Sequence, residues 1–223
     1  MKLDKDIFNK WVDWIEKIKA DLTGIINNQQ IYNYFIEVVN ANLEHIKKNH
    51  GVLFCDFVRK CYAVQAAIGV RRHIKTDEDS ISLLRLLGQI KKCANQFTYD
   101  FYLERYPINR NKFEWQKSTF LNFSKDGKAV SEEMVNKDIQ QLKNIGSKVS
   151  NFVDRGMAHL DKRGYDIKVT FADLRKSIDS FNKIACKYIC FIKSEGYFTL
   201  ESTIQFDWQK IFTVPLDIRN NKN

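Results

Sequence analysis

The sequence predicts an all-α fold, an up-and-down bundle of about six or seven helices. Along several long segments, apolar side chains recur at intervals of three and four, which keeps one face of a helix apolar. Glycine and proline are scarce, with 9 and 2 residues among 223, which disfavours a fold built from many tight turns. The length fits one domain and no low-complexity linker divides it. We therefore expect a single domain over residues 1–223, with its core at about 25–195 and a tail at 196–223 packed on the bundle.

The ends of the helices follow from residues that commonly start or stop them. The third expected helix is apolar nearly all round, which predicts a central position in the bundle. In chain order, the helices are expected from Lys5 to Leu22, ended by Gly24; from Asn28 to Lys48; from Val52 to His73; from Thr76, with Asp79 in a capping position; from Ser131 to about Phe152; and from Thr170, with Asp173 in a capping box, to Gly196.

Two segments have no long helical pattern. Residues 97–130 are rich in aromatic side chains, and we expect a connection with short helices packed on the bundle. Interleaved lysines and arginines would also suit a stacking surface for single-stranded nucleic acid, although such aromatics more often fill a core. The tail from Tyr197 to Pro215 alternates in places like a strand, which suits a hairpin or an extended arm anchored by Trp208, Ile211, Phe212 and Pro215.

Composition excludes some functions and permits others. The net charge of +9 permits a polyanionic partner such as RNA, but it favours a mildly basic solvated surface, because the lysines and arginines are spread along the chain and mixed with acidic residues. The five cysteines form no C-x-x-C pair, and no histidine falls in ligand spacing with them, so no metal and no cofactor is expected. Phosphate-binding, dinucleotide-binding, esterase and zinc-protease motifs are absent. With no signal-peptide pattern and no long apolar segment, we expect a cytoplasmic protein without a membrane span.

The segment that could carry chemistry is Asn151 to Arg163. Arg155 and His159 are four residues apart, so a continuing helix would place them on one face. Imidazole can take a proton near neutral pH, and guanidinium can hold a phosphate, a combination that suits metal-free RNA cleavage. Asp154 or Asp161 could orient them. The alternative is a helix-end arginine paired with one of these aspartates, beside a structural histidine.

Arg71, Arg72 and Arg163 are the candidate contacts to nucleic acid. The first two end the third expected helix, together with His73. Cations there could contact phosphate, but they also interact favourably with the helix C-terminus. The acidic run from Asp77 to Asp79 follows directly and would neutralise them.

Several of these segments resemble the HEPN superfamily (higher eukaryote and prokaryote nucleotide-binding domains), and more closely its abortive-infection AbiU-type branch. The resemblance rests on AHLDKR before TFADLRKSID, on AIGVRRHIKTDEDSISLLRLL from Ala67 to Leu87, and on the closing DWQKIFTVPLD. It covers about residues 25 to 218. It implies a helical bundle, often a homodimer, in which an arginine and a histidine separated by four to six residues, one such motif from each subunit, meet at the interface and cleave RNA without metal.

The match to the family motif is incomplete. Aligning Ala158 to Asp161 places Val153 where the family arginine stands, and Arg155 comes two residues late. Two hypotheses follow. In the first, the protein is a metal-independent endoribonuclease of abortive-infection or toxin–antitoxin type, with His159 as base or acid and Arg155 as phosphate clamp. In the second, it is a catalytically silent helical module that dimerises, binds nucleic acid or binds a partner protein such as an antitoxin. In the second hypothesis, Val153→Arg would add activity.

Overall fold

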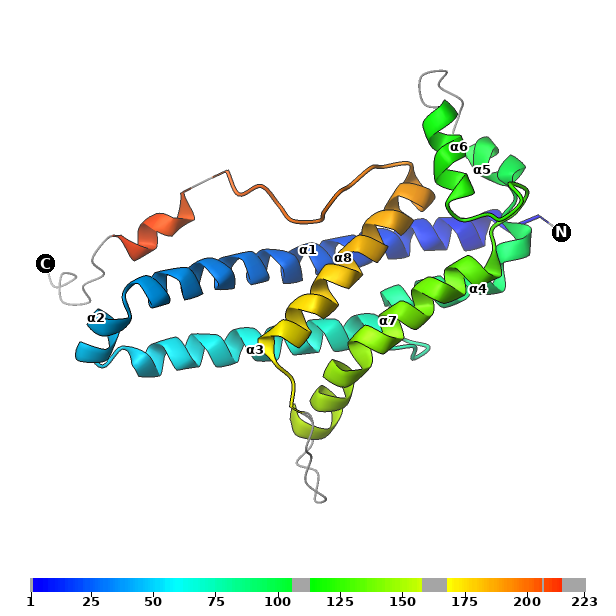
Figure 1. Ribbon diagram of the computed structural model, residues 1–223. Coiled ribbons are helices and arrows are strands. Elements are labelled where there is room, and N and C mark those ends of the chain that lie inside the picture. The colour runs from blue at the N-terminus through cyan, green and yellow to red at the C-terminus, as the bar shows by residue number, and fades with distance from the viewer. Residues whose placement is uncertain (1, 106–112, 158–167, 206, 214–223) are drawn as a thin grey trace, which may run out of the picture.

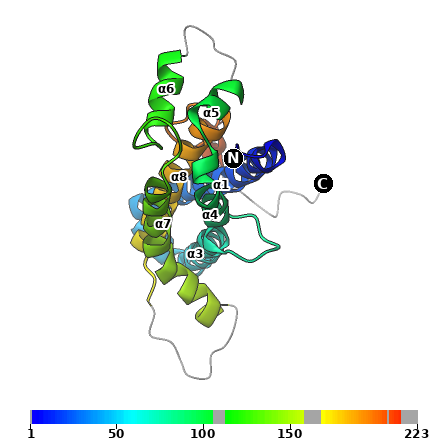
Figure 2. The ribbon, with the colours of Figure 1, turned by 90° about the vertical axis from the view of Figure 1, so that its right-hand side faces the viewer.

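The computed structural model of the protein describes residues 2–105, 113–157, 168–205 and 207–213. The all-α prediction is confirmed: within these ranges the chain forms eight α-helices and no strand. The helices form two layers. The long helices α1 and α3 lie antiparallel in one layer with α4, and α7 and α8 cross one face of that layer obliquely (Figures 1 and 2).

The first two expected helices are mostly one. Helix α1 runs from Lys5 to Ala41 without a break at Gly24, and only the short α2 (Leu43–Lys48) follows it. The prediction that Gly24 ends a helix is therefore wrong. Ile18, Leu22 and Ile25 are buried on either side of it, and their burial outweighs the roughly 1 kcal/mol that an interior glycine costs a helix.

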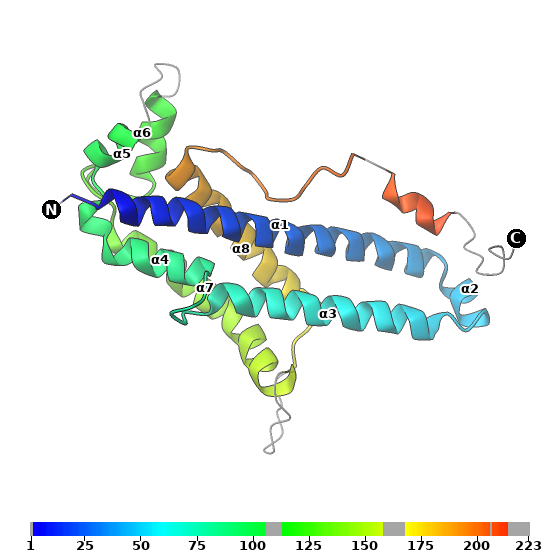
Figure 3. The ribbon, with the colours of Figure 1, turned by 180° about the vertical axis from the view of Figure 1, so that it is seen from behind.

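Helix α3 (Val52–Ile74) packs against α1, and its buried residues all lie in its C-terminal half. The contact is close at Gly69, where an added Cβ would lie 2.6 Å from Ile25 Cδ1. The N-terminal half leaves Leu53 82% and Phe57 62% exposed. The predicted central position therefore holds for half of the helix; the other half projects beyond α7 and α8 (Figure 3).

Helix α4 (Leu83–Lys92) begins seven residues later than the sequence suggested. Its cap is Ser82, whose hydroxyl accepts a hydrogen bond from Arg85 N at 3.0 Å and donates one to the carbonyl of Lys75. Thr76 and Asp79 lie in the loop before it. Ser82 is fully buried, so tertiary position rather than the local capping pattern decides where the helix starts.

The aromatic-rich connection packs on the bundle, as expected. It forms a short 3₁₀ turn η1 (Ala94–Gln96) and the helices α5 (Tyr99–Arg105) and α6 (Phe113–Leu121). Its rings surround Phe191 of α8, with Phe123 stacked at 4.0 Å between ring centroids. The ring cluster consists of Phe97, Phe101, Tyr102, Phe120, Phe123 and Phe191, all buried. For these residues the core-filling alternative holds, and the stacking-surface alternative does not.

Helices α7 (Glu132–Phe152) and α8 (Phe171–Lys193) start where the sequence indicates. The Ser131 hydroxyl caps α7 and accepts from Met134 N, while Thr170 and Asp173 form the expected capping box of α8. Helix α8 ends at Ser194 in a left-handed conformation, two residues before the expected Gly196. A π-helical turn, η2 (Val153–Met157), continues α7.

The described chain after α8 is an extended arm rather than a hairpin. This C-terminal arm (residues 195–205 and 207–213) lies along α1 and ends in the 3₁₀ turn η3 (Trp208–Phe212) (Figure 1). Trp208 and Phe212 contact Tyr34 of α1 as predicted; Pro215 lies outside the described residues. One core cluster runs from Leu3 to Leu200. Within the described ranges, none of the helices has the length and hydrophobicity that a membrane crossing requires.

Candidate functional site

Four of the seven predicted site residues lie in the described structure. They are Arg71, Arg72, Asp154 and Arg155. Arg71, Asp154 and Arg155 lie where the C-terminal ends of α3 and α7 come together. His159, Asp161 and Arg163 lie outside the described residues. The region formed by Arg71, Asp154 and Arg155 is called the α3–α7 corner below.

The end of α7 and the π-helical turn that begins at Val153 together set which side chains of this corner face solvent. Val153 is only 4% exposed and belongs to the core. Asp154 is half-buried and Arg155 is exposed. π-Turns within α-helices occur frequently at functional sites, because the extra residue alters the direction of the side chains that follow. The position that the resemblance assigns to the family arginine is thus an inward-facing one.

Arg71 and Asp154 form an ion pair across 83 residues of sequence, with the guanidinium donating to Oδ1. Ser150, one turn earlier on α7, donates its hydroxyl to Asp154 Oδ2 at 3.4 Å. The Arg71 side chain is 26% exposed, so it retains access to solvent. Because a guanidinium carries five N–H donors in a planar fork, a carboxylate on one edge leaves the other edge available for an anion.

Arg72 points the other way, toward α1. Its guanidinium holds Asp21 in a two-point contact, with one nitrogen 2.8 Å from Oδ1 and Nε donating to Oδ2 at 3.0 Å. Buried His73 lies behind it, with Nε2 2.9 Å from Asp21 Oδ2. Burial raises the pKa of Asp21, but His73 and Arg72 together outweigh it, so this pKa lies below its ordinary value.

The charges of Arg71 and Arg72 are not neutralised by the acidic run from Asp77 to Asp79, contrary to what the sequence suggested. The acidic run after α3 does not pair with Arg71 or Arg72, since Asp77 contacts Lys75 at 3.0 Å instead. The partners come from α1 and α7. Arg72 is therefore fixed by a structural ion pair, whereas Arg71 and Arg155 remain the cations of the corner that are placed to meet a ligand. Among the residues that the structure describes, no cluster of three or more histidine, cysteine and acidic side chains could hold a metal ion.

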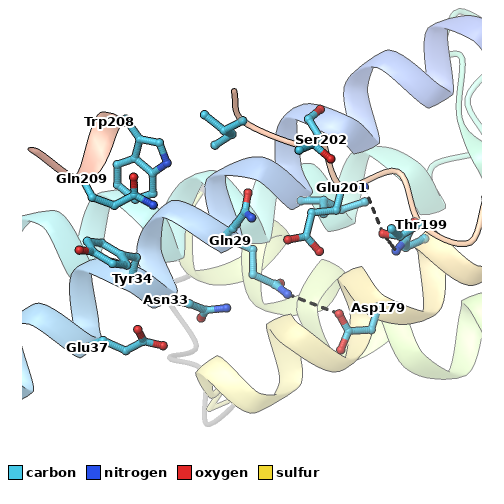
Figure 4. Close-up of a pocket in the computed structure, with 15 residues that line it drawn as sticks. Gln29, Asn33, Tyr34, Glu37, Asp179, Thr199, Glu201, Ser202, Trp208 and Gln209 are labelled. Carbon is cyan, nitrogen blue, oxygen red and sulfur yellow. Dashed lines mark hydrogen bonds between the residues drawn. The ribbon is translucent and has the colours of Figure 1, made fainter. Parts of the chain in front are cut away.

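A second site was missed in the sequence. A groove of about 610 Å³ lies between α1, α8 and the C-terminal arm (Figure 4). We call it the arm groove. Its polar walls come from segments more than 140 residues apart, such as Gln29 of α1 and Asp179 of α8, whose side chains are hydrogen-bonded at 3.4 Å. The available signal was an uninterrupted run of four amide side chains, Asn27 to Gln30, in an amphipathic helix.

Comparison of the chain with protein-family models, with curated proteins and with solved structures finds no match. Function must therefore be argued from the two sites themselves.

Proposed function

We propose that this chain is a HEPN-like protein of abortive-infection or toxin–antitoxin type that cleaves RNA at the α3–α7 corner. The observation that supports the proposal is the contact between Arg71 and Asp154. Two residues chosen separately from the sequence, one for phosphate binding and one for catalysis, lie side by side at the end of the helix that leads to His159. The proposal places the protein in the cytoplasm, consistent with its five free cysteines.

In this mechanism the two arginines hold the scissile phosphate. Arg155 is exposed and Arg71 is oriented by Asp154, so together they supply several N–H donors to the phosphate oxygens. His159 takes the proton from the ribose 2′-hydroxyl, whose oxygen attacks the adjacent phosphorus. The 5′-oxygen leaves and receives a proton from the imidazolium. Arg71 thus fills the role that the resemblance would give to an arginine at position 153.

The test is a ribonuclease assay in EDTA with total tRNA and a single-stranded RNA. Native protein would be compared with His159→Ala, Arg155→Ala and Arg71→Ala. Arg59→Ala is the matched control, since Arg59 is an exposed arginine of the same helix whose ion pair with Asp56 is local. Circular dichroism would establish that each variant is folded.

We expect cleavage by the native protein and by Arg59→Ala, and at least a hundredfold loss in the other three variants. Cleavage that survives His159→Ala would assign the activity elsewhere. Full activity in Arg71→Ala would remove Arg71 from the mechanism while leaving Arg155 and His159 in place.

A second function is favoured by a different observation: α3 exposes a continuous apolar stripe. Leu53, Phe57, Val64 and Ile68 recur at helical spacing on one face and are 41–82% exposed. Solvent-facing apolar rows of this kind mark interaction surfaces. In this alternative the chain is a catalytically silent module that forms a homodimer along the stripe, or binds an antitoxin-like partner protein there.

Whether the stripe mediates self-association can be tested by measuring the molar mass with light scattering after gel filtration. A dimer should become monomeric in Leu53→Glu/Phe57→Glu. It should persist in Phe198→Glu, because Phe198 is a fully exposed aromatic outside the stripe. A native monomer at all concentrations would exclude self-association through α3.

A further inference from the structure

The arm groove is acidic although the protein is basic. The chain carries a net charge of +9, yet the described residues that line the groove include Glu37, Asp179 and Glu201 and no lysine, arginine or histidine. Within the described residues, none of these three carboxylates forms an ion pair. Arg175 of α8 lies next to the groove, but it donates to Asn33, a lining residue, at 3.2 Å rather than to one of the carboxylates. The three like charges repel one another, and a bound cation would reduce that repulsion.

The groove also presents hydrogen-bond acceptors that have no donor. The side chains of Gln29 and Gln30 both line the groove, and within the described residues their buried Oε1 atoms have no hydrogen-bond partner. Gln29 is held in place because its Nε2 donates to Asp179 Oδ1 at 3.4 Å. Buried acceptors are normally satisfied. A ligand with N–H donors would satisfy the two amide oxygens and complement the charge of the three carboxylates.

One end of the groove is aromatic. Tyr34 and Trp208 meet edge to face, with ring centroids 5.1 Å apart. Figure 4 shows both rings at the end of the groove opposite Asp179, with Glu201 between the two ends. Aromatic faces attract organic cations through their quadrupole, and Trp does so most strongly. This end adds affinity for a cation that also has apolar carbon atoms.

The walls are fixed by side-chain hydrogen bonds that do not involve the proposed ligand. Asn27 of α1 binds Ser202 of the arm twice, donating to its hydroxyl and accepting from its backbone N–H, both at 3.0 Å. Asn182 of α8 accepts from Leu200 N at 2.9 Å and donates to Thr199 at 2.9 Å. Because the arm is fastened to both helices, the groove exists before any ligand enters.

We propose that the arm groove binds an organic cation with several N–H donors, an alkylammonium or guanidinium group. The carboxylates supply charge, the two glutamine oxygens accept hydrogen bonds, and the ring pair covers the carbon chain. A volume of about 610 Å³ is that of a small-molecule site. The cation comes either from a free polyamine or from a lysine or arginine side chain of a partner polypeptide. This site is independent of the RNA proposal.

The experiment is isothermal titration calorimetry at constant ionic strength with two probes. Spermidine represents the free polyamine, and acetyl-Gly-Arg-Gly-amide represents the side chain of a polypeptide. Each probe is titrated into the native chain and into Asp179→Asn/Glu201→Gln, which removes two charges while preserving shape. The control is Asp13→Asn/Asp100→Asn, which changes net charge equally at exposed sites. Asp13 is on α1 about 24 Å from Gln29, from the helical rise of 1.5 Å per residue.

We expect at least one probe to bind the native chain, at least tenfold weaker binding by the groove variant, and a change within twofold in the control. Binding of spermidine alone identifies a free polyamine as the occupant, and binding of the peptide alone identifies a partner's side chain. The proposal is overturned if neither probe binds the native chain. It is also overturned if both double variants weaken binding equally, because then the net charge of the protein and not the groove attracts the probe.

Discussion

Two glycine substitutions test how closely the three central helices approach one another. Gly146 of α7 lies where α7, α3 and α8 meet. A Cβ added there would stand 2.8 Å from Ile74 Cγ2 and 3.1 Å from Phe181 Cζ. Gly24, in the middle of α1, has no atom of the described residues within 4 Å of the same added atom. The pair separates the effect of helix propensity from the effect of packing.

The magnitudes follow from these distances. Replacing an interior helical glycine by alanine gains about 1 kcal/mol of helix propensity at both positions. At Gly24 nothing opposes that gain, so Gly24→Ala should stabilise the protein by about 1 kcal/mol. At Gly146 the new methyl group must displace Ile74 and Phe181, the latter 1% exposed, and overpacking a close-packed site costs about 1–3 kcal/mol. We expect Gly146→Ala to destabilise by about 1 kcal/mol, a difference of about 2 kcal/mol between the variants.

The assay is urea unfolding followed by circular dichroism. The midpoint should rise in Gly24→Ala and fall in Gly146→Ala, with an unchanged slope in both. If Gly146→Ala stabilises as much as Gly24→Ala, the contact between the three helices is looser than described. If Gly24→Ala destabilises, α1 is not continuous at that point, and the break that the sequence suggested is real.

Three further outcomes are expected. Phe191→Ala should cost about 3–5 kcal/mol in urea unfolding, because it empties the centre of the ring cluster; a loss below 1 kcal/mol would contradict that packing. Val153→Arg should destabilise the fold by several kcal/mol and give no new RNA cleavage, because it buries an unpaired charge; a stable and more active variant would support the silent-module hypothesis. Hydrogen bonds from Lys148 and the α8 cap hold the pKa of Asp173 down, at about 2. Because the folded value is the lower one, this stabilisation is present above about pH 4 and is lost as the pH falls towards 2, so the stability difference between native protein and Asp173→Asn should shrink over that range.

The helices that the sequence predicted correctly are those with strong local signals. Ser131 and Thr170 begin α7 and α8 as expected, because a side-chain cap is a local interaction that short sequence patterns contain. The errors arose where tertiary burial decided the outcome. Gly24 is a typical helix-end residue, but α1 continues through it because the isoleucines beside it are buried. Thr76 has a capping pattern, yet the buried Ser82 caps α4 instead.

The candidate site was predictable only in part, for a related reason. Arg71 and Asp154 were each chosen for their chemistry, but their pairing depends on how α3 and α7 cross, which no short pattern encodes. The inward direction of Val153 continues the buried row Leu142, Gly146 and Val149 at ordinary helical spacing, whereas the π-helical turn after it, which short patterns do not predict, affects the side chains that follow. The arm groove was not predicted at all, because its walls come from the two ends of the chain.

The two proposed functions use the same face of α3, so one variant of that face can distinguish between them. Arg71 follows Val64 and Ile68 at helical spacing, so the apolar stripe leads directly to the α3–α7 corner. A second copy bound along the stripe would therefore reach the edge of the proposed nuclease site. If the monomeric stripe variant Leu53→Glu/Phe57→Glu still cleaves RNA, one chain holds the complete site and the stripe serves another purpose. If cleavage is lost while the fold and RNA binding by the monomer persist, the second copy supplies part of the catalytic machinery. In that case the exposed apolar stripe of α3 positions the α3–α7 corners of two copies next to each other.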